Sequence, residues 1–146
     1  MILVENKKAR IKYQVLQTYN AGLVLSGSEV KSLRNKLGSL DGARIVVRGG
    51  EAYLLGATIP PYSHAAVQKE YDATRTRKLL LKKSEIRELS DAESTKGLTI
   101  VPLSVYNDRH LKLTVAIVRG KGKADKREDI KKRDAKREAA RVLRGK

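Results

Sequence analysis

The chain of 146 residues contains no cysteine, no tryptophan and no phenylalanine, and it has only three prolines. Without cysteine there is no disulfide and no thiolate ligand for a metal ion, which fits a reducing cellular interior. The two histidines, His64 and His110, lie in separate segments and do not form a zinc-binding set together. Both are expected to be solvated loop residues. We therefore expect no metal and no cofactor.

Long apolar runs and enzyme motifs are also absent. No run approaches the roughly 20 residues of a bilayer-spanning helix, and the N-terminal MILVENKKARIKY becomes charged after four residues, too soon for a signal peptide. Neither the phosphate-binding pattern G-x-x-x-x-G-K-[ST] nor the nucleophile pattern G-x-S-x-G occurs. These absences predict a cytoplasmic protein that is not an enzyme and does not bind membranes.

Positive charge is what the sequence has in excess. Lys and Arg total 32 against 16 Asp and Glu, a formal net charge of +16. Solubility needs a net charge of magnitude about 2 to 8, so the excess indicates a polyanionic partner, most commonly a nucleic acid. The only aromatic residues are six tyrosines. These are too few for the stacking surface of an RRM, so recognition is expected to use RNA shape and backbone.

Short strands separated by turn signals fill most of the first 119 residues. In ARIVVRGGEAYLLGATI, Gly49-Gly50 divides two strand-like runs and predicts a tight hairpin. The segment YNAG, between YQVLQT (13–18) and GLVL (22–25), predicts a second hairpin turn.

A central antiparallel pair is predicted near the end of this region. GLTIVPLSVY (97–106) and LKLTVAIVR (111–119) are rich in β-branched and aliphatic residues and are joined by the polar NDRH. Pro102 removes one backbone donor from the first of them. We therefore expect a β-bulge or a sheet edge at that residue.

The first of two predicted helices is SEVKSLRNKL. Ser28 is predicted as its N-cap, and Val30, Leu33 and Leu37 share one face at helical spacing.

The second predicted helix is SEIRELSDAES. Ser84 is its predicted N-cap, Ile86 and Leu89 are expected to face the core, and the helix is expected to end before Gly97. Short strands, two helices and no βαβ rhythm predict a mainly β fold, a small antiparallel barrel that is closed or partly open.

Two groups of charged residues are candidate RNA contacts. In TRTRKLLLKK, Arg75 and Arg77 are predicted on one side of an extended chain and Lys78 on the other, followed by three leucines that bury. The arginines could bind phosphates or form a solvated strand edge.

Glu29 is the second candidate, and two roles are open for it. It suits a helix N-terminus, where the dipole favours a carboxylate. Among Lys31, Arg34 and Lys36 it could also accept a hydrogen bond from a base or a ribose.

From Gly120 onward the composition changes. Residues 120–146 carry 12 Lys or Arg against 5 Asp or Glu, with only Ile130, Val142 and Leu143 as larger aliphatic side chains. Asp125 and Glu128 have capping-box spacing, but ion pairs four residues apart add only about 0.2 to 0.5 kcal/mol each. Without packing such a helix is marginal. We therefore expect a tail that is disordered when free and helical when a partner holds it.

Three motifs, in this order, resemble the family of tmRNA-binding proteins of bacterial ribosome rescue, known as small protein B or SsrA-binding proteins. The motifs are GSEVKSLR (27–34), TRTRKLLL (74–81) and DKREDIK (125–131). The resemblance extends over nearly the whole chain, from ENKKARIKY onward.

The resemblance implies a barrel with an embedded OB-like fold at 1–119 that grips the tRNA-like domain of tmRNA. It implies that the basic tail at 120–146 becomes helical in the ribosome, in the empty mRNA channel and the small-subunit decoding centre. Elongation factor Tu and alanyl-tRNA synthetase are implied as indirect partners, and the free protein is expected to be a monomer. An alternative is a ribosomal or initiation-factor-like OB protein that binds rRNA only.

Residue roles implied by the resemblance fall into two sets. The tmRNA-binding set is Asn6, Glu29, Lys31, Arg34, Arg75, Arg77 and Lys78. The ribosome-engaging set in the tail is Lys121, Lys123, Asp125, Lys126, Arg127, Ile130 and Lys131. Gly122 and Ala124 depart from the family, which commonly has a basic residue at the first position and an aromatic residue or His at the second.

Overall fold

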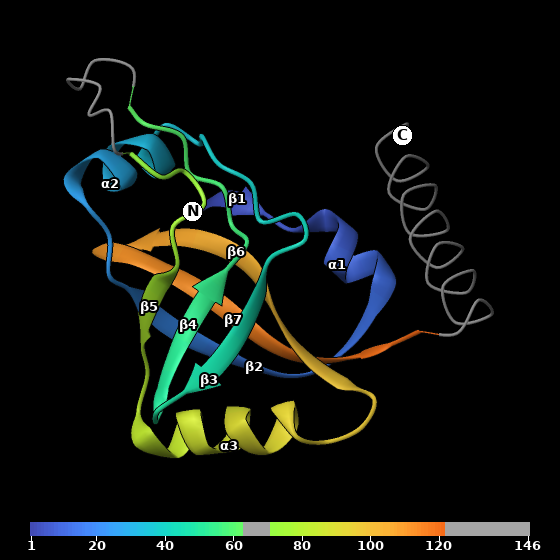
Figure 1. The fold of residues 1–146 in the computed structure, drawn as a ribbon. Coiled ribbons are helices and arrows are strands. Elements are labelled where there is room, and N and C mark those ends of the chain that lie inside the picture. Colours follow the sequence, from blue (N-terminus) through green and yellow to red (C-terminus); the bar gives the residue numbers. More distant parts are fainter. Residues whose placement is uncertain (63–70, 122–146) are drawn as a thin grey trace, which may run out of the picture.

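The structure is a computed structural model that describes residues 1–62 and 71–121 (Figure 1). Within these residues the elements follow in the order β1 (Ile2–Glu5), α1 (Lys7–Lys12), β2 (Tyr13–Leu23), α2 (Gly27–Arg34), β3 (Arg44–Arg48), β4 (Glu51–Leu55), β5 (Arg77–Leu80), α3 (Lys83–Glu93), β6 (Leu98–Asp108) and β7 (His110–Gly120). The mainly β fold is therefore as predicted.

The strands form one antiparallel sheet in the order β1-β6-β7-β2-β5-β4-β3. The sheet curls so that β3, at one edge, comes into contact with β6 near the other edge without a hydrogen-bonded ladder between them. The result is the small, partly open, OB-like barrel that the sequence indicates. Helix α3 lies across one end, and α1 and α2 lie at the other (Figure 1).

The core is aliphatic and fills the inside of the curled sheet. Leu54, Leu79, Leu113 and Val115 are each at most 2% exposed, and Leu89 of α3 is completely buried against them. Each Å² of apolar surface that is buried stabilises the folded state by about 25 cal/mol, and this burial is the main source of stability for such a core. This packing fixes which side of β5 faces inward, and hence the position of Arg77.

Two of the strand predictions are confirmed. Gly49 and Gly50, with φ of 59° and 75°, make the two-residue turn between β3 and β4. Strands β6 and β7 pair antiparallel next to the centre of the sheet, and their register shifts between Pro102 and Ser104, which is the predicted bulge.

The predicted hairpin at YNAG is wrong. Strand β2 runs without interruption through these residues and pairs with β7, from Tyr13 opposite Gly120 to Gly22 opposite Lys112. Gly22 serves a different purpose, because a Cβ on it would approach Cβ of Leu80 on β5 to 3.1 Å. Its missing side chain allows two strands to come close.

Both predicted N-caps are also wrong. Helix α2 is capped by Ser26 rather than Ser28, and α3 begins after Lys82, whose amide donates to the Glu85 carboxylate, rather than at Ser84. In each case the N-cap lies three residues before a glutamate, which is capping-box spacing. Ile86 and Leu89 face the core as predicted, and α3 ends at Glu93, before Gly97.

Two leucines do not bury as predicted. Leu37 follows the end of α2, where Lys36 has a positive φ of 61°, and it is 41% exposed. Leu80 is 55% exposed because side chains alternate along β5, which places Arg77 and Leu79 inside and Lys78 and Leu80 outside. Strand β1 and helix α1 were not predicted from the sequence pattern.

Candidate nucleic-acid interface

The first turn of α2 is closed by a capping box between Ser26 and Glu29. The Glu29 amide donates to the Ser26 hydroxyl at 3.2 Å, and the Ser26 amide donates to Oε1 of Glu29 at 2.8 Å. These bonds satisfy amides that have no partner inside the helix. Glu29 therefore has the helix-terminal role that its position suggested.

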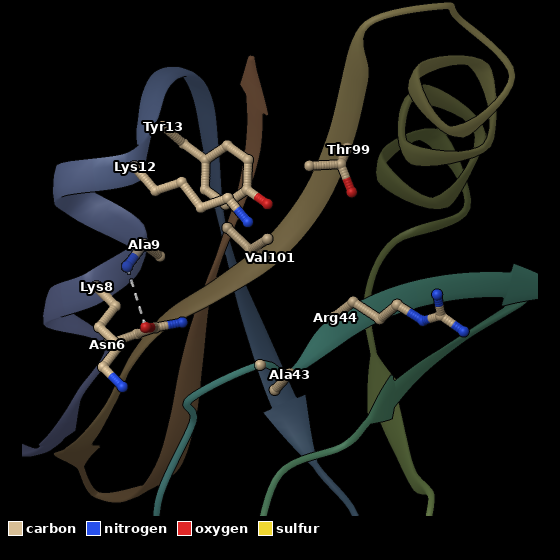
Figure 2. A pocket seen from close by; sticks show the side chains of 10 residues that line it. Asn6, Lys8, Ala9, Lys12, Tyr13, Ala43, Arg44, Thr99 and Val101 are labelled. Carbon is tan, nitrogen blue, oxygen red and sulfur yellow. Dashed lines mark hydrogen bonds between the residues drawn. The ribbon is translucent and has the colours of Figure 1, made fainter. Parts of the chain in front are cut away.

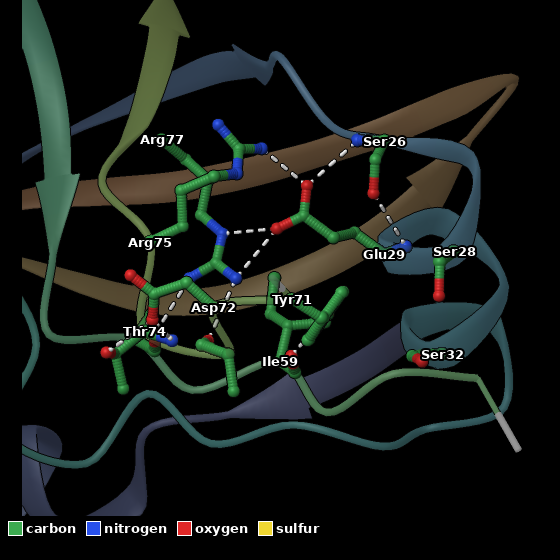
Figure 3. A network of polar contacts seen from close by, with 12 residues as sticks. Ser26, Ser28, Glu29, Ser32, Ile59, Tyr71, Asp72, Thr74, Arg75 and Arg77 are labelled. Carbon is green, nitrogen blue, oxygen red and sulfur yellow. Dashed lines mark hydrogen bonds and ion pairs between the residues drawn. The ribbon is translucent and has the colours of Figure 1, made fainter. Parts of the chain in front are cut away.

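The same carboxylate binds two arginines of the TRTR segment (Figure 3). Nη2 of Arg75 donates to Oε1 at 2.5 Å, and Nε of Arg77 donates to Oε2 at 2.7 Å. Nη2 of Arg77 is also 2.7 Å from Oε2. Glu29, which is only 1% exposed, thus joins α2 to β5 and to the turn that precedes β5.

Arg77 is completely buried, and main-chain oxygens accept its remaining hydrogen bonds. Nη1 donates to the carbonyl of Ala57 at 2.8 Å, and Nη2 donates to that of Ala73 at 2.9 Å. A buried guanidinium is tolerated only when it is paired and hydrogen-bonded, and here every nitrogen has an acceptor. In this arrangement Arg77 offers no donor to a phosphate and acts as an internal clamp.

The network holds Glu29 in its charged form. Burial alone raises the pKa of a carboxyl group, but the hydrogen bonds from Arg75, the Ser26 amide and Arg77 outweigh this effect. The pKa of Glu29 therefore lies below its ordinary value. Burial, together with the nearby charge of Glu29, raises the pKa of Tyr71, whose hydroxyl donates to the carbonyl of Ile59.

Hydroxyl groups attach α2 to the segment that follows β4. The Ser32 hydroxyl donates to the carbonyl of Pro60 at 2.7 Å, and the Tyr62 amide donates to the Ser28 hydroxyl at 3.1 Å. On the outer side, Nζ of Lys31 lies 5.9 Å from the centre of the Tyr62 ring. The helix and its cations therefore have a fixed place beside the Glu29 network.

The exposed cations of the predicted tmRNA-binding set do not all share one surface. Lys31 and Arg34 lie on α2, and the Arg75 side chain, 43% exposed, reaches the same helix through Glu29. Lys78 lies on the outer face of β5, where it is 3.5 Å from a carboxylate oxygen of Glu51. The structure thus places Lys31 and Arg34 on the helix that Arg75 contacts, and Lys78 on a strand.

Asn6, the remaining member of that set, is a buried N-cap. Its Oδ1 accepts from the Ala9 amide at 3.2 Å, and its Nδ2 donates to the carbonyls of Pro102 at 2.9 Å and Leu40 at 3.3 Å. These bonds hold α1 against β6. Figure 2 shows the bond between Asn6 and Ala9. Asn6 also forms part of the wall of a pocket of about 400 Å³.

The cations of this pocket were missed by the sequence reasoning. Lys8 and Lys12 of α1 and Arg44 of β3 line it, together with the ring of Tyr13 (Figure 2). Nζ of Lys12 lies 5.2 Å from the centre of that ring. The basic run ENKKARIK could have indicated the two lysines as a positively charged surface. Arg44 joins them only because the sheet curls, which no local pattern predicts.

Most of the residues predicted to engage the ribosome lie outside the described residues. This is so for Lys123, Asp125, Lys126, Arg127, Ile130 and Lys131, and also for His64. Lys121 is described, and it is tied to α1, since its amide donates to the carbonyl of Lys12 at 3.2 Å and its Nζ to that of Arg10 at 3.4 Å. His110 is exposed at the start of β7.

Residues 1–62 and 71–121 contain neither a metal-binding cluster nor a membrane-spanning helix. No group of three or more His, Asp or Glu side chains there could hold a metal ion. None of the helices in this part of the chain is long and apolar enough to cross a membrane.

The SmpB protein family model matches residues 3–145 of the chain. The chain belongs to the SmpB family. The SsrA-binding protein of Gloeobacter violaceus is 45% identical over 144 residues, covering 98% of this chain and 94% of its own, and that of Ehrlichia canis is 45% identical over 146 residues, covering 99% and 98%.

A solved SmpB structure agrees with this assignment. It is described as "tmRNA-SmpB: a journey to the center of the bacterial ribosome". Its chain is 41% identical to this one and superimposes with a TM-score of 0.68 over 86% of this chain and 92% of that one. The fold of that SmpB chain is therefore shared over most of this chain.

Proposed function

We propose that the protein binds the tRNA-like domain of tmRNA and brings it to stalled ribosomes for trans-translation. The observation that carries this proposal is the family match over residues 3–145, together with about 45% identity to SsrA-binding proteins over nearly their full length. The net charge of +16 supports a nucleic-acid partner independently of any relative.

In this proposal the predicted tmRNA-binding residues form two groups, exposed residues that contact RNA and buried residues that position them. Lys31, Arg34 and Arg75 are exposed around α2, so their cations can contact phosphates, and Lys78 can do so from the outer face of β5. Asn6, Glu29 and Arg77 are at most 3% exposed, so they position the exposed residues rather than contact RNA. We add the pocket cations Lys8, Lys12 and Arg44 as a second group of phosphate contacts.

Arg75 has the most specific role in this scheme. Its guanidinium is held by a charged, buried carboxylate and yet is 43% exposed, so one side can bind Glu29 while another binds a phosphate. Fixing a long side chain before binding reduces the entropy lost when RNA arrives. Lys31 and Arg34 on the same helix then extend the positive surface.

The basic tail at 120–146 is proposed to engage the small-subunit decoding centre and the empty mRNA channel, becoming helical there. The tail set is Lys121, Lys123, Asp125, Lys126, Arg127, Ile130 and Lys131. The protein would act in the cytoplasm as a monomer without bond chemistry of its own, while elongation factor Tu and alanyl-tRNA synthetase act on tmRNA.

The test is a titration against the tRNA-like domain of tmRNA and against an ordinary tRNA, each at two salt concentrations. A preference for the tRNA-like domain that survives the higher salt would support recognition of RNA shape. Equal affinities that fall together with salt would mean binding through phosphates alone. The alternative of an OB protein that binds rRNA only would then be preferred.

A further inference from the structure

A cavity of about 470 Å³ lies between α3 and the tip of the β3–β4 hairpin. Its floor is aliphatic, since Ile86 is 8% exposed and Val47 is half-buried. Figure 1 shows α3 at the end of the barrel opposite to α1 and α2. The cavity is therefore separate from both the Glu29 network and the pocket beside Asn6.

Two cations line this cavity from α3. Lys83 and Arg87 are four residues apart, so they lie on one face of the helix with a rise of about 6 Å between them. Both are exposed, and neither has an ion pair with another described residue. Ser90, one turn further on, adds a hydroxyl group.

The carboxylates of α3 do not neutralise these cations, because three of them bind elsewhere. Glu85 accepts from the Lys82 amide, Glu88 from the Tyr19 hydroxyl at 2.6 Å, and Glu93 from Arg48 and the Val47 amide. The fourth, Asp91, lies one turn after Arg87, but no described carboxylate forms an ion pair with Lys83 or Arg87. A ligand carboxylate would therefore find two positive charges that are not already paired.

The hairpin tip leaves its backbone open to a ligand. Gly49 and Gly50 line the cavity, and a Cβ added to either would meet no atom within 4 Å. Among the described residues, no turn hydrogen bond uses the amide of Gly49 or Gly50. These two amides can thus donate to an oxygen placed in the cavity.

The surroundings favour a protein over RNA as the occupant. Helix α3 has four acidic residues against two basic ones, in a chain whose net charge is +16. A long polyanion crossing this helix would meet those carboxylates, whereas a peptide needs to place only one carboxylate in the cavity. The lining also has no aromatic ring on which a base could stack.

We propose that this cavity is a docking site for a segment of a protein partner in which a carboxylate lies next to an aliphatic side chain. The aliphatic group covers Val47 and Ile86. The carboxylate pairs with Lys83 and Arg87 and accepts from the amides of the hairpin tip. The site does not depend on the proposed tmRNA binding, because it lies on another face and uses other residues.

Nuclear magnetic resonance on the full chain, labelled with nitrogen-15, tests the proposal. The probe is an acetylated pentapeptide amide with one leucine between two aspartates and an alanine at each end. We expect saturable shifts of the Gly49, Gly50 and Ile86 amides. Arg87→Glu should weaken binding at least about tenfold, because it replaces attraction by repulsion. Lys96→Glu, an equal charge change at an exposed lysine beyond α3, should leave the affinity unchanged.

Three outcomes would overturn the proposal. The first is the absence of any shift at millimolar peptide. The second is equal binding of a peptide with serine in place of leucine, since the aliphatic floor would then play no part. The third is a single-stranded uridine heptamer that shifts the same amides at lower concentration than the peptide, which would make this a surface for RNA. Arg87→Gln, which only removes the charge, guards against a folding defect in Arg87→Glu.

Discussion

The carboxylate of Glu29 and the guanidinium of Arg77 form an ion pair in which neither side chain is more than 1% exposed. The pair joins the first turn of α2 to the start of β5, across 48 positions of sequence. Desolvating two charges has a high cost, and the capping bonds and carbonyl bonds around the pair offset it. Its main effect is therefore to fix the position of the exposed residues near it, above all Arg75.

Replacing Glu29 by alanine should lower the free energy of unfolding by about 3 to 5 kcal/mol, because Arg77 would be left buried without its counter-charge. Urea denaturation measures this loss. Glu85→Ala is the matched control, since Glu85 accepts from the N-cap amide of α3, as Glu29 does on α2, without a buried arginine. It should cost only about 1 kcal/mol. Equal losses in the two variants would show that the ion pair adds nothing beyond the cap.

The lowered pKa of Glu29 gives stability a defined dependence on pH. The pKa of a glutamate in the unfolded state is about 4.3. As the pH falls, the unfolded state therefore takes up a proton before the folded state does. The contribution of Glu29 is complete above that value and is lost as the pH drops through the folded pKa. Glu29→Gln should flatten this decline when unfolding is measured from pH 7 to pH 3. A smaller loss of stability towards low pH should remain in Glu29→Gln, because the pKa of Glu93 is also lowered.

Replacing Arg75 and replacing Arg77 should affect different properties, RNA binding in the first case and stability in the second. Arg75→Ala should preserve most of the stability and weaken binding to the tRNA-like domain, with a salt slope smaller by about 0.7 to 0.9 for one lost phosphate contact. Arg77→Ala should instead destabilise the site strongly, because it leaves the buried Glu29 carboxylate with only the partly exposed Arg75 as a counter-charge. Arg48→Ala removes another exposed arginine paired to a glutamate, far from α2, and is the control. An unchanged slope in Arg75→Ala would argue against its phosphate contact.

Local signals predicted much of the fold, and the errors have identifiable causes. Gly49-Gly50 predicted its hairpin because the two-residue turn requires positive φ at both positions. YNAG misled because a glycine can also permit close strand approach, and only the pairing of β2 with both β5 and β7 distinguishes the two. The cap of α2 was misplaced because two serines, Ser26 and Ser28, precede Glu29. The cap of α3 was misplaced because its N-cap is Lys82, which is not a usual capping residue. The S-x-x-E spacing of Ser26 and Glu29 was already visible in the sequence.

The burial of the candidate site residues was not predicted from the sequence. The alternation along β5 places Arg77 in phase with Leu79, so an inward position could have been inferred. Its counter-charge is distant in sequence, however, and no local pattern links Glu29 to Arg77. The pocket cation Arg44 was missed for the same reason, because β3 meets α1 only through the curl of the sheet.

Truncation after Lys121 should separate the two proposed activities. It keeps the bonds from Lys121 to the carbonyls of Lys12 and Arg10, and therefore the end of β7, while it removes 11 of the 12 basic residues of the tail. Binding to the tRNA-like domain should be nearly unchanged, and tagging of peptides on stalled ribosomes should be lost. Gel-shift titration and a translation assay with a message lacking a stop codon measure the two. Tagging that survives truncation would contradict the role proposed for the tail, whereas loss of both activities would mean that the tail also binds tmRNA.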